Sequence, residues 1–376
     1  MAWCFDHDTE PCIVDPSPTA QDDTDGGYNG LPNSPSAHRT AQFRRVDVPA
    51  ARRLPARFVL PNGGGIAYGE FHLDRASLTW LMANLPSIED ELTRGAAWIT
   101  LWDAMLNGEV TPDALLTLAI QALRVEQNEL NISRVLSYAR DAYWRYSTPA
   151  ARTRFAPRIE LVLRLGLDAA RTPSLKSSWF SALRDMALTP PTVQWLTRVW
   201  MQETQVPGLT LSETDYIRLA QDLAVRNPAG AAAILDRQSD RIKNPDRKAQ
   251  FAFVRPSLSP DPAQRDAWFA SLIDPANRRR EPWVLEGLRY LHHPLRAAAS
   301  EKYLETSLIL VREIQRTGDI FFPKRWMDAT LSGHQSASAA ATVRKFVDGL
   351  PPEYPERLRR VILSSADEPF RAAPTK

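Results

Sequence analysis

The stretch that decides the fold reads Phe58-Val-Leu-Pro-Asn-Gly-Gly-Gly-Ile-Ala-Tyr-Gly-Glu-Phe-His-Leu-Asp74. Its first three residues are an apolar run, and the next five predict a turn, because Pro fixes φ while Asn and Gly tolerate positive φ. Side chains then alternate from Ile66 to Phe71 at the period of a strand. Asp74 is a candidate helix N-cap. The stretch therefore predicts a β-hairpin within residues 44–73 and helices from residue 74.

Beyond Asp74 the chain repeats one device, in which a small polar residue comes directly before Pro. The polar side chain can cap orphan N–H groups, and Pro suits the first helical position because it needs no donor there. The pairs begin at Thr111, Thr148, Thr189, Asn227, Asn244, Ser259 and Asp274. The first four are spaced like the helix pairs of a HEAT-like array.

Apolar residues between these starts follow helical spacing. One example is the set Trp98, Leu101, Trp102 and Met105; others are Ile132 to Ala139 and Tyr216 to Leu223. Each helix has one apolar face, which neighbouring helices must cover. The sequence therefore predicts an all-α fold over 74–371, specifically a HEAT-like α-solenoid of antiparallel helix pairs preceded by the short β-hairpin.

The junction at 58–74 resembles the one in M1-family zinc aminopeptidases between a small β-sandwich and the C-terminal helical domain. The likeness runs from about residue 46 to about residue 371. Four later segments are similar to landmarks of that domain: Thr93–Asp103, Glu126–Ile132, Asn244–Arg247 and Glu313–Trp326. The resemblance implies that residues 44–73 are the remnant of a β-sandwich. These motifs are structural, so they specify the domain and not the chemistry.

The catalytic motif of that family is missing from this sequence. M1 enzymes bind zinc through H-E-x-x-H, whose spacing places both imidazoles on one helix face. No two of the six histidines stand four apart, namely His7, His38, His72, His292, His293 and His334. The Gly-x-Met-Glu-Asn loop that grips the substrate amino terminus is absent too. We therefore expect no catalytic residue, metal or cofactor in this chain, although the family's enzymes use zinc.

The resemblance implies a non-catalytic domain that caps the active site of an M1 aminopeptidase and shapes access for peptides. Its partners would be a peptide substrate or a missing catalytic domain. The alternative is a stand-alone α-solenoid adaptor that binds a protein or peptide on its concave face.

Composition excludes several other classes. The net charge is +2 with basic and acidic residues interleaved, which indicates a solvated surface and not a nucleic-acid-binding stripe. No apolar run reaches the length of a membrane span, and the N-terminus lacks the pattern of a signal peptide, so a cytoplasmic location is the default. Residues 1–43 are acidic and rich in Pro and Gly, which predicts a disordered tail. An unrelated tail, a fusion scar and a misassigned start all fit that composition.

Several candidate ligand sites have a simpler interpretation. Cys4, His7 and Cys12 match no closed zinc spacing. Asp23-Thr-Asp25-Gly26 resembles a calcium loop but lacks its Glu. Gly63-Gly64-Gly65 is not followed by Lys-Ser/Thr, so we interpret it as a hairpin turn. His292 and His293 are adjacent on a predicted helix and point about 100° apart, so we expect a helix end before Pro294 and no shared metal.

The best candidates for contact with a peptide are Arg316, Lys324 and Arg325, which flank the aromatic turn Phe321-Phe322-Pro323. The resemblance implies that basic residues on the inner wall of the domain meet the carboxyl end of the peptide. The alternative is an interhelix joint whose charges are solvated or cap carbonyls, as charge clusters usually are.

The β-hairpin also predicts a weak point. Two strands are marginal by themselves, and an unpaired edge can recruit a second chain. We therefore expect self-association through this hairpin.

Overall fold

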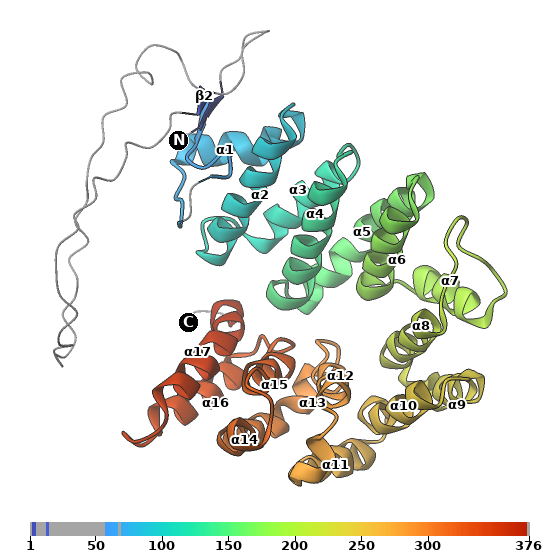
Figure 1. Cartoon of the computed structure of the whole chain (residues 1–376). Helices are drawn as coiled ribbons and strands as arrows, with labels where there is room; N and C mark the ends of the chain where they lie inside the picture. The colour runs from blue at the N-terminus through green and yellow to red at the C-terminus, as the bar shows by residue number, and fades with distance from the viewer. Residues whose placement is uncertain (1, 5–12, 15–56, 67–68, 374–376) are drawn as a thin grey trace, which may run out of the picture. The chain divides into compact units, whose positions relative to one another are not determined.

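The computed structural model describes residues 2–4, 13–14, 57–66 and 69–373 (Figure 1). These residues are mostly helical, which confirms the all-α fold. The chain divides into two compact units, residues 1–104 and residues 105–376.

The first unit contains a small antiparallel sheet with strand order β2-β1-β3. Its strands are β1 (Ala2–Cys4), β2 (Ile13–Val14) and β3 (Phe58–Leu60). β1 and β2 lie within the tail that composition predicted to be disordered, and the rest of residues 1–43 falls outside the described residues. Pairing satisfies the backbone N–H and C=O groups of these short segments, which propensity alone does not foresee.

The predicted hairpin is wrong in its pairing. The turn forms, with Gly65 at φ +68° and the Gly63 N–H 3.2 Å from the Leu60 carbonyl. However, Ile66 and residues 69–73 contain no strand, and β3 pairs with β1, placing Leu60 opposite Ala2. The Val59 N–H donates to the Ser77 hydroxyl at 2.8 Å. A polar side chain of the next helix therefore supplies the acceptor that a second hairpin strand would have supplied.

Asp74 caps the first helix as predicted. Its carboxylate accepts the Ser77 N–H at 3.0 Å, and α1 (Arg75–Asn84) follows. The Phe58 and Trp80 rings stack with centroids 4.1 Å apart, so α1 packs on β3. For this reason the division between units falls after residue 104 and not near residue 74. The unit also holds η2 (Leu85–Ser87) and most of α2 (Glu91–Leu106).

The second unit is a series of helices in which neighbours along the chain pack on one another (Figure 1). Within the described part of the chain, no helix is long and apolar enough to cross a membrane. The elements are α3 (Pro112–Ala122), α4 (Glu129–Asp141), the π-helix η3 (Ala142–Tyr146), α5 (Pro149–Ala169), α6 (Pro173–Met186), α7 (Pro190–Met201), α8 (Glu213–Arg226), η4 (Pro228–Gly230), α9 (Ala231–Arg241), α10 (Pro245–Leu258), α11 (Pro262–Ser271), η5 (Pro275–Arg278), α12 (Glu281–Leu291), α13 (Ala297–Ser300), η6 (Glu301–Tyr303), α14 (Leu304–Thr317), α15 (Phe322–Leu331), α16 (Ala337–Asp348) and α17 (Glu356–Ala372).

Most of the predicted polar-Pro starts are confirmed. Thr111, Thr148 and Asn244 cap α3, α5 and α10 through their side chains. Asn227 and Asp274 also cap, but the elements that they begin are short 3₁₀ turns.

Two of the starts differ from prediction. Thr189 precedes α7, but its side chain makes no cap there and its hydroxyl donates to the buried carboxylate of Glu160 on α5. Glu160 Oε1 accepts the Thr189 N–H at 2.8 Å, so a distant helix caps α7. The start at Ser259 is displaced, because α11 begins at Pro262 with Asp261 as its cap.

The helical spacing of apolar residues is confirmed by burial. Ile132, Val135 and Ala139 are buried, and so are Trp98 and Met105, whereas Trp102 and Tyr216 are only half-buried. A large apolar cluster holds the C-terminal helices together and draws its members from residues 253–370. At the end of the chain α17 contacts η3, so the series of helices returns to its own early part. The solenoid architecture stays a prediction.

Candidate functional site

The structure places the three predicted basic residues in different surroundings. Arg316 is exposed in the last turn of α14. Lys324 forms an ion pair with Asp328 one turn along α15. Arg325 is exposed, with its guanidinium 5.6 Å from the centre of the Phe321 ring. Neighbouring residues on a helix point apart. None of the three lines the pocket of the second unit that is described next.

That pocket has a volume of about 240 Å³ and is built by residues from several helices that are far apart in the sequence. Charged and aromatic side chains dominate its lining. The residues are Arg140, Asp141, Trp144, Arg145, Asp185, Asp222, Arg226, Arg289, His292, His293, Pro294, Ser332 and Gly333. No spacing within one helix could have predicted this set.

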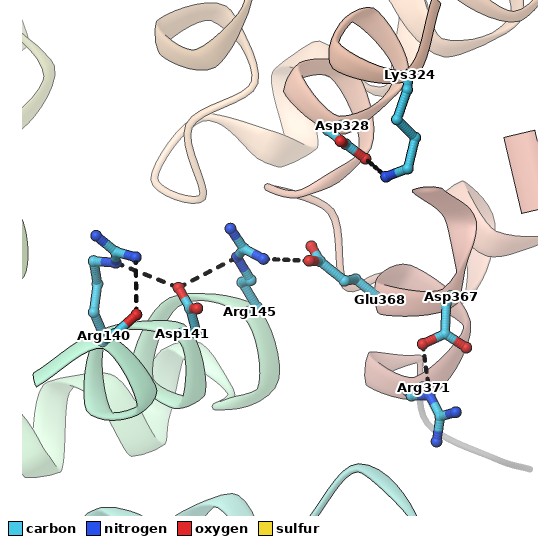
Figure 2. A network of polar contacts seen from close by, with 9 residues as sticks. Arg140, Asp141, Arg145, Lys324, Asp328, Asp367, Glu368 and Arg371 are labelled. Carbon is cyan, nitrogen blue, oxygen red and sulfur yellow. Dashed lines mark hydrogen bonds and ion pairs between the residues drawn. The ribbon is translucent and has the colours of Figure 1, made fainter. Parts of the chain in front are cut away.

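One wall carries a chain of ion pairs (Figure 2). Asp141 Oδ1 lies 3.3 Å from Arg140 Nε and 3.6 Å from Arg145 Nε. Arg145 Nη1 also pairs with Glu368 of α17. Lys324 and Asp328 lie close enough to influence the charge on Glu368. Arg140 and Arg145 therefore each have a carboxylate partner from the protein.

A second part of the lining is a partly buried acidic pair that a buried cation holds. Arg184 Nη2 lies 3.1 Å from Asp185, and its Nε lies 2.9 Å from Asp222, at an angle that makes an ion pair but no hydrogen bond. Burial raises the pKa of Asp222 to about 6, against the lowering effect of Arg184 and Arg226. The negative charge of this part is therefore matched mainly by Arg184.

The remaining two arginines of the lining differ in what they bind. The Arg226 guanidinium donates to the backbone carbonyls of Asp185, Ala187 and Asp222 at 2.6–2.9 Å. Arg289 is exposed and has no hydrogen bond or ion pair with any described residue. Arg289 is thus the cation of the lining whose charge the described chain leaves unmatched.

The floor of the pocket is a close crossing of two loops. A Cβ at Gly333 would lie 1.7 Å from the His292 carbonyl oxygen, so only glycine fits there. His292 Nδ1 and His334 Nε2 share a hydrogen bond of 2.8 Å, and both rings are buried. Burial lowers the pKa of both imidazoles, that of His334 to about 4.

Each histidine next to Pro294 has its own partner. α12 ends at Leu291, which confirms the predicted helix end. His292 pairs with His334, whereas His293 Nδ1 accepts the Leu295 N–H at 3.2 Å. The His292–His334 contact joins residues 42 positions apart, so no local pattern could predict it.

A comparison with models of protein families matches residues 58–368 to the ERAP1-like C-terminal domain. The chain belongs to this family. A search of curated proteins finds no significant match. The match to the ERAP1-like C-terminal domain agrees with the resemblance drawn from the sequence, because it is the helical C-terminal domain of the M1 aminopeptidase type.

The other predicted sites fare differently in this ERAP1-like C-terminal domain. Gly63 to Gly65 form the predicted turn. His7, Cys12 and residues 23–26 lie outside the described residues, so the interpretation of the tail stays a prediction. The pocket was missed because its residues come from helix ends that only the fold brings together.

Proposed function

We propose that this ERAP1-like C-terminal domain is a non-catalytic part of an M1 zinc aminopeptidase, and that it caps the active site and shapes the access of peptides. The family match supports this role. The chain itself contributes walls and charge to such an enzyme. The zinc would be bound by another part of the enzyme.

The single observation that carries the peptide-binding part is the unmatched charge of Arg289 at a pocket whose other cations have partners. A guanidinium binds a carboxylate with two parallel hydrogen bonds, which suits the free carboxyl end of a peptide. We therefore place the carboxyl end in this pocket, with Arg289 as its anchor. Arg316, Lys324 and Arg325 lie outside the lining and take no part in this contact.

The test is a thermodynamic cycle measured by isothermal titration calorimetry. One partner is a short peptide with a free carboxyl end or with an amidated end; the other is the protein or its Arg289→Gln variant. We expect amidation to weaken binding to the protein about tenfold, which is 1.4 kcal/mol. Arg289→Gln should weaken binding of the peptide with a free carboxyl end by a similar factor. In this variant, amidation of the peptide should have almost no effect on binding.

Arg359→Gln is the matched control, because Arg359 is exposed on α17 and does not line the pocket. Equal binding of both peptides to the unaltered protein would contradict the carboxylate site and favour a stand-alone adaptor. Mass spectrometry of the protein from its source tests the partner directly, since the proposal expects a covalent or tightly bound catalytic part.

A further inference from the structure

The second unit closes on itself at a seam, which we define as the contact of η3 and the start of α5 with α17 and the loop before α16. Arg145 of η3 pairs with Glu368 of α17, 223 positions away (Figure 2). Gln335 Nε2 donates to the Trp144 carbonyl at 2.9 Å, and Gln335 Oε1 accepts from Arg152 at 3.0 Å. These contacts are polar, whereas the cluster that joins the C-terminal helices is apolar.

The seam holds an acidic group in an unfavourable place. Glu368 Oε2 is buried and has no hydrogen-bond partner among the described residues. Burial raises the pKa of Glu368, and Asp141 and Asp328 raise it further, while Arg145 and Lys324 lower it. Burial raises the pKa of the Tyr146 phenol, and the Glu368 carboxylate raises it further. Arg145 is the cation that pairs directly with Glu368, and Lys324 adds a smaller compensation.

Both sides of the seam build the pocket. Trp144 and Arg145 line it from η3, and Ser332 and Gly333 line it from the loop that leads to Gln335. Movement of η3 away from this loop would separate these two parts of the lining. The seam therefore holds two parts of the pocket together.

We propose that the seam is a latch, which opens and closes the pocket. The Arg145–Glu368 ion pair holds the latch closed. The latch does not depend on what the pocket binds. A partly exposed ion pair is weak and is screened by salt, so this pair adds only a small free energy to the closed state. Removing Arg145 leaves the half-buried Glu368 carboxylate without its ion-pair partner, which favours the open state.

The charge on Glu368 should make a single and a double variant behave differently. Arg145→Gln should open the latch at pH 7.5, because the Glu368 carboxylate then has lost its compensating cation. Acid should close this variant again, because the closed state binds a proton on Glu368 more tightly than the open state does. Arg145→Gln with Glu368→Gln should stay closed both at pH 7.5 and in acid, since position 368 then carries no carboxylate that needs a cation.

The experiment measures distances between spin labels by double electron–electron resonance on the full chain with Cys4 and Cys12 replaced by Ser. Labels at Ser133→Cys on α4 and Ser364→Cys on α17 span the seam, and both serines are exposed. Labels at Ser133→Cys and Ser177→Cys span the contact of α4 with α6 and are the control. Arg255→Gln is the matched variant, because it removes an ion pair between Arg255 of α10 and Asp236 of α9.

In Arg145→Gln at pH 7.5 we expect the fraction of molecules at the longer seam distance to rise at least about tenfold. The control distance and the Arg255→Gln variant should not change. A seam distance that stays fixed in Arg145→Gln would overturn the latch. So would an equal change in the control distance, which would show general loosening, or a double variant as open as Arg145→Gln.

Discussion

The joint between α14 and α15 and the seam between η3 and α17 hold helices together by different means. At the joint, Trp326 is fully buried, and its indole N–H donates to the Ser307 carbonyl at 3.1 Å. At the seam, a half-buried ion pair and the side-chain amide of Gln335 contribute polar contacts. Apolar burial grows with the area removed from water, whereas a polar contact replaces one with water and contributes little net free energy. The difference predicts that the second unit is more rigid at the joint than at the seam.

The largest effect is expected at the joint. Trp326→Ala should lower the free energy of unfolding by about 3–5 kcal/mol, because it leaves a cavity in the C-terminal cluster and removes a buried hydrogen bond. Urea unfolding followed by far-UV circular dichroism measures this. Ile309→Ala on α14 is the control, since Ile309 is 60% exposed and should change stability by less than about 0.5 kcal/mol. If Trp326→Ala lowered the free energy of unfolding only slightly, the proposed contrast between the joint and the seam would be wrong.

A middle-sized effect is expected from pH at the floor of the pocket. The folded-state pKa of His334 is about 4, below the roughly 6.5 of an unfolded chain. Between these values the unfolded state binds more protons, so stability falls as the pH drops through that window. From His334 we expect a loss of about 2 kcal/mol between pH 7 and pH 5.

His334→Gln isolates this contribution, because the variant loses one titrating group and keeps His292. Its unfolding free energy, measured by urea at both pH values, should depend on pH less steeply than that of the unaltered protein. If the unfolding free energies of the two proteins changed equally with pH, His334 would not be buried in its neutral form.

The smallest effect is expected at the seam. Gln335→Ala removes the bond to the Trp144 carbonyl and the bond from Arg152, and should cost only about 1 kcal/mol. Gln315→Ala on the exposed face of α14 is the control. Hydrogen exchange should also show faster exchange in η3 and α17. If Gln335→Ala lowered the free energy of unfolding as much as Trp326→Ala does, the seam would be as stable as the joint, against this prediction.

The sequence predicted most of the helical elements because their signals are local. Caps at Asp74, Thr111 and Asn244 depend on residues within one turn, and burial of Ile132, Val135 and Ala139 follows from helical spacing. The errors occur where a distant group satisfies a local need. Glu160 caps α7 in place of Thr189, and β1 pairs with β3 in place of residues 66–71.

The sequence by itself determined the family, the helical class and the absence of the H-E-x-x-H motif from these 376 residues. Only the tertiary structure decided the pocket and the seam. Arg145 meets Glu368 across 223 positions, and His292 meets His334 across 42. Helical periodicity reports which face of a helix is buried, but it carries no information on which distant charge arrives opposite. That choice depends on the path of the whole series of helices, and the packing of every joint contributes to it.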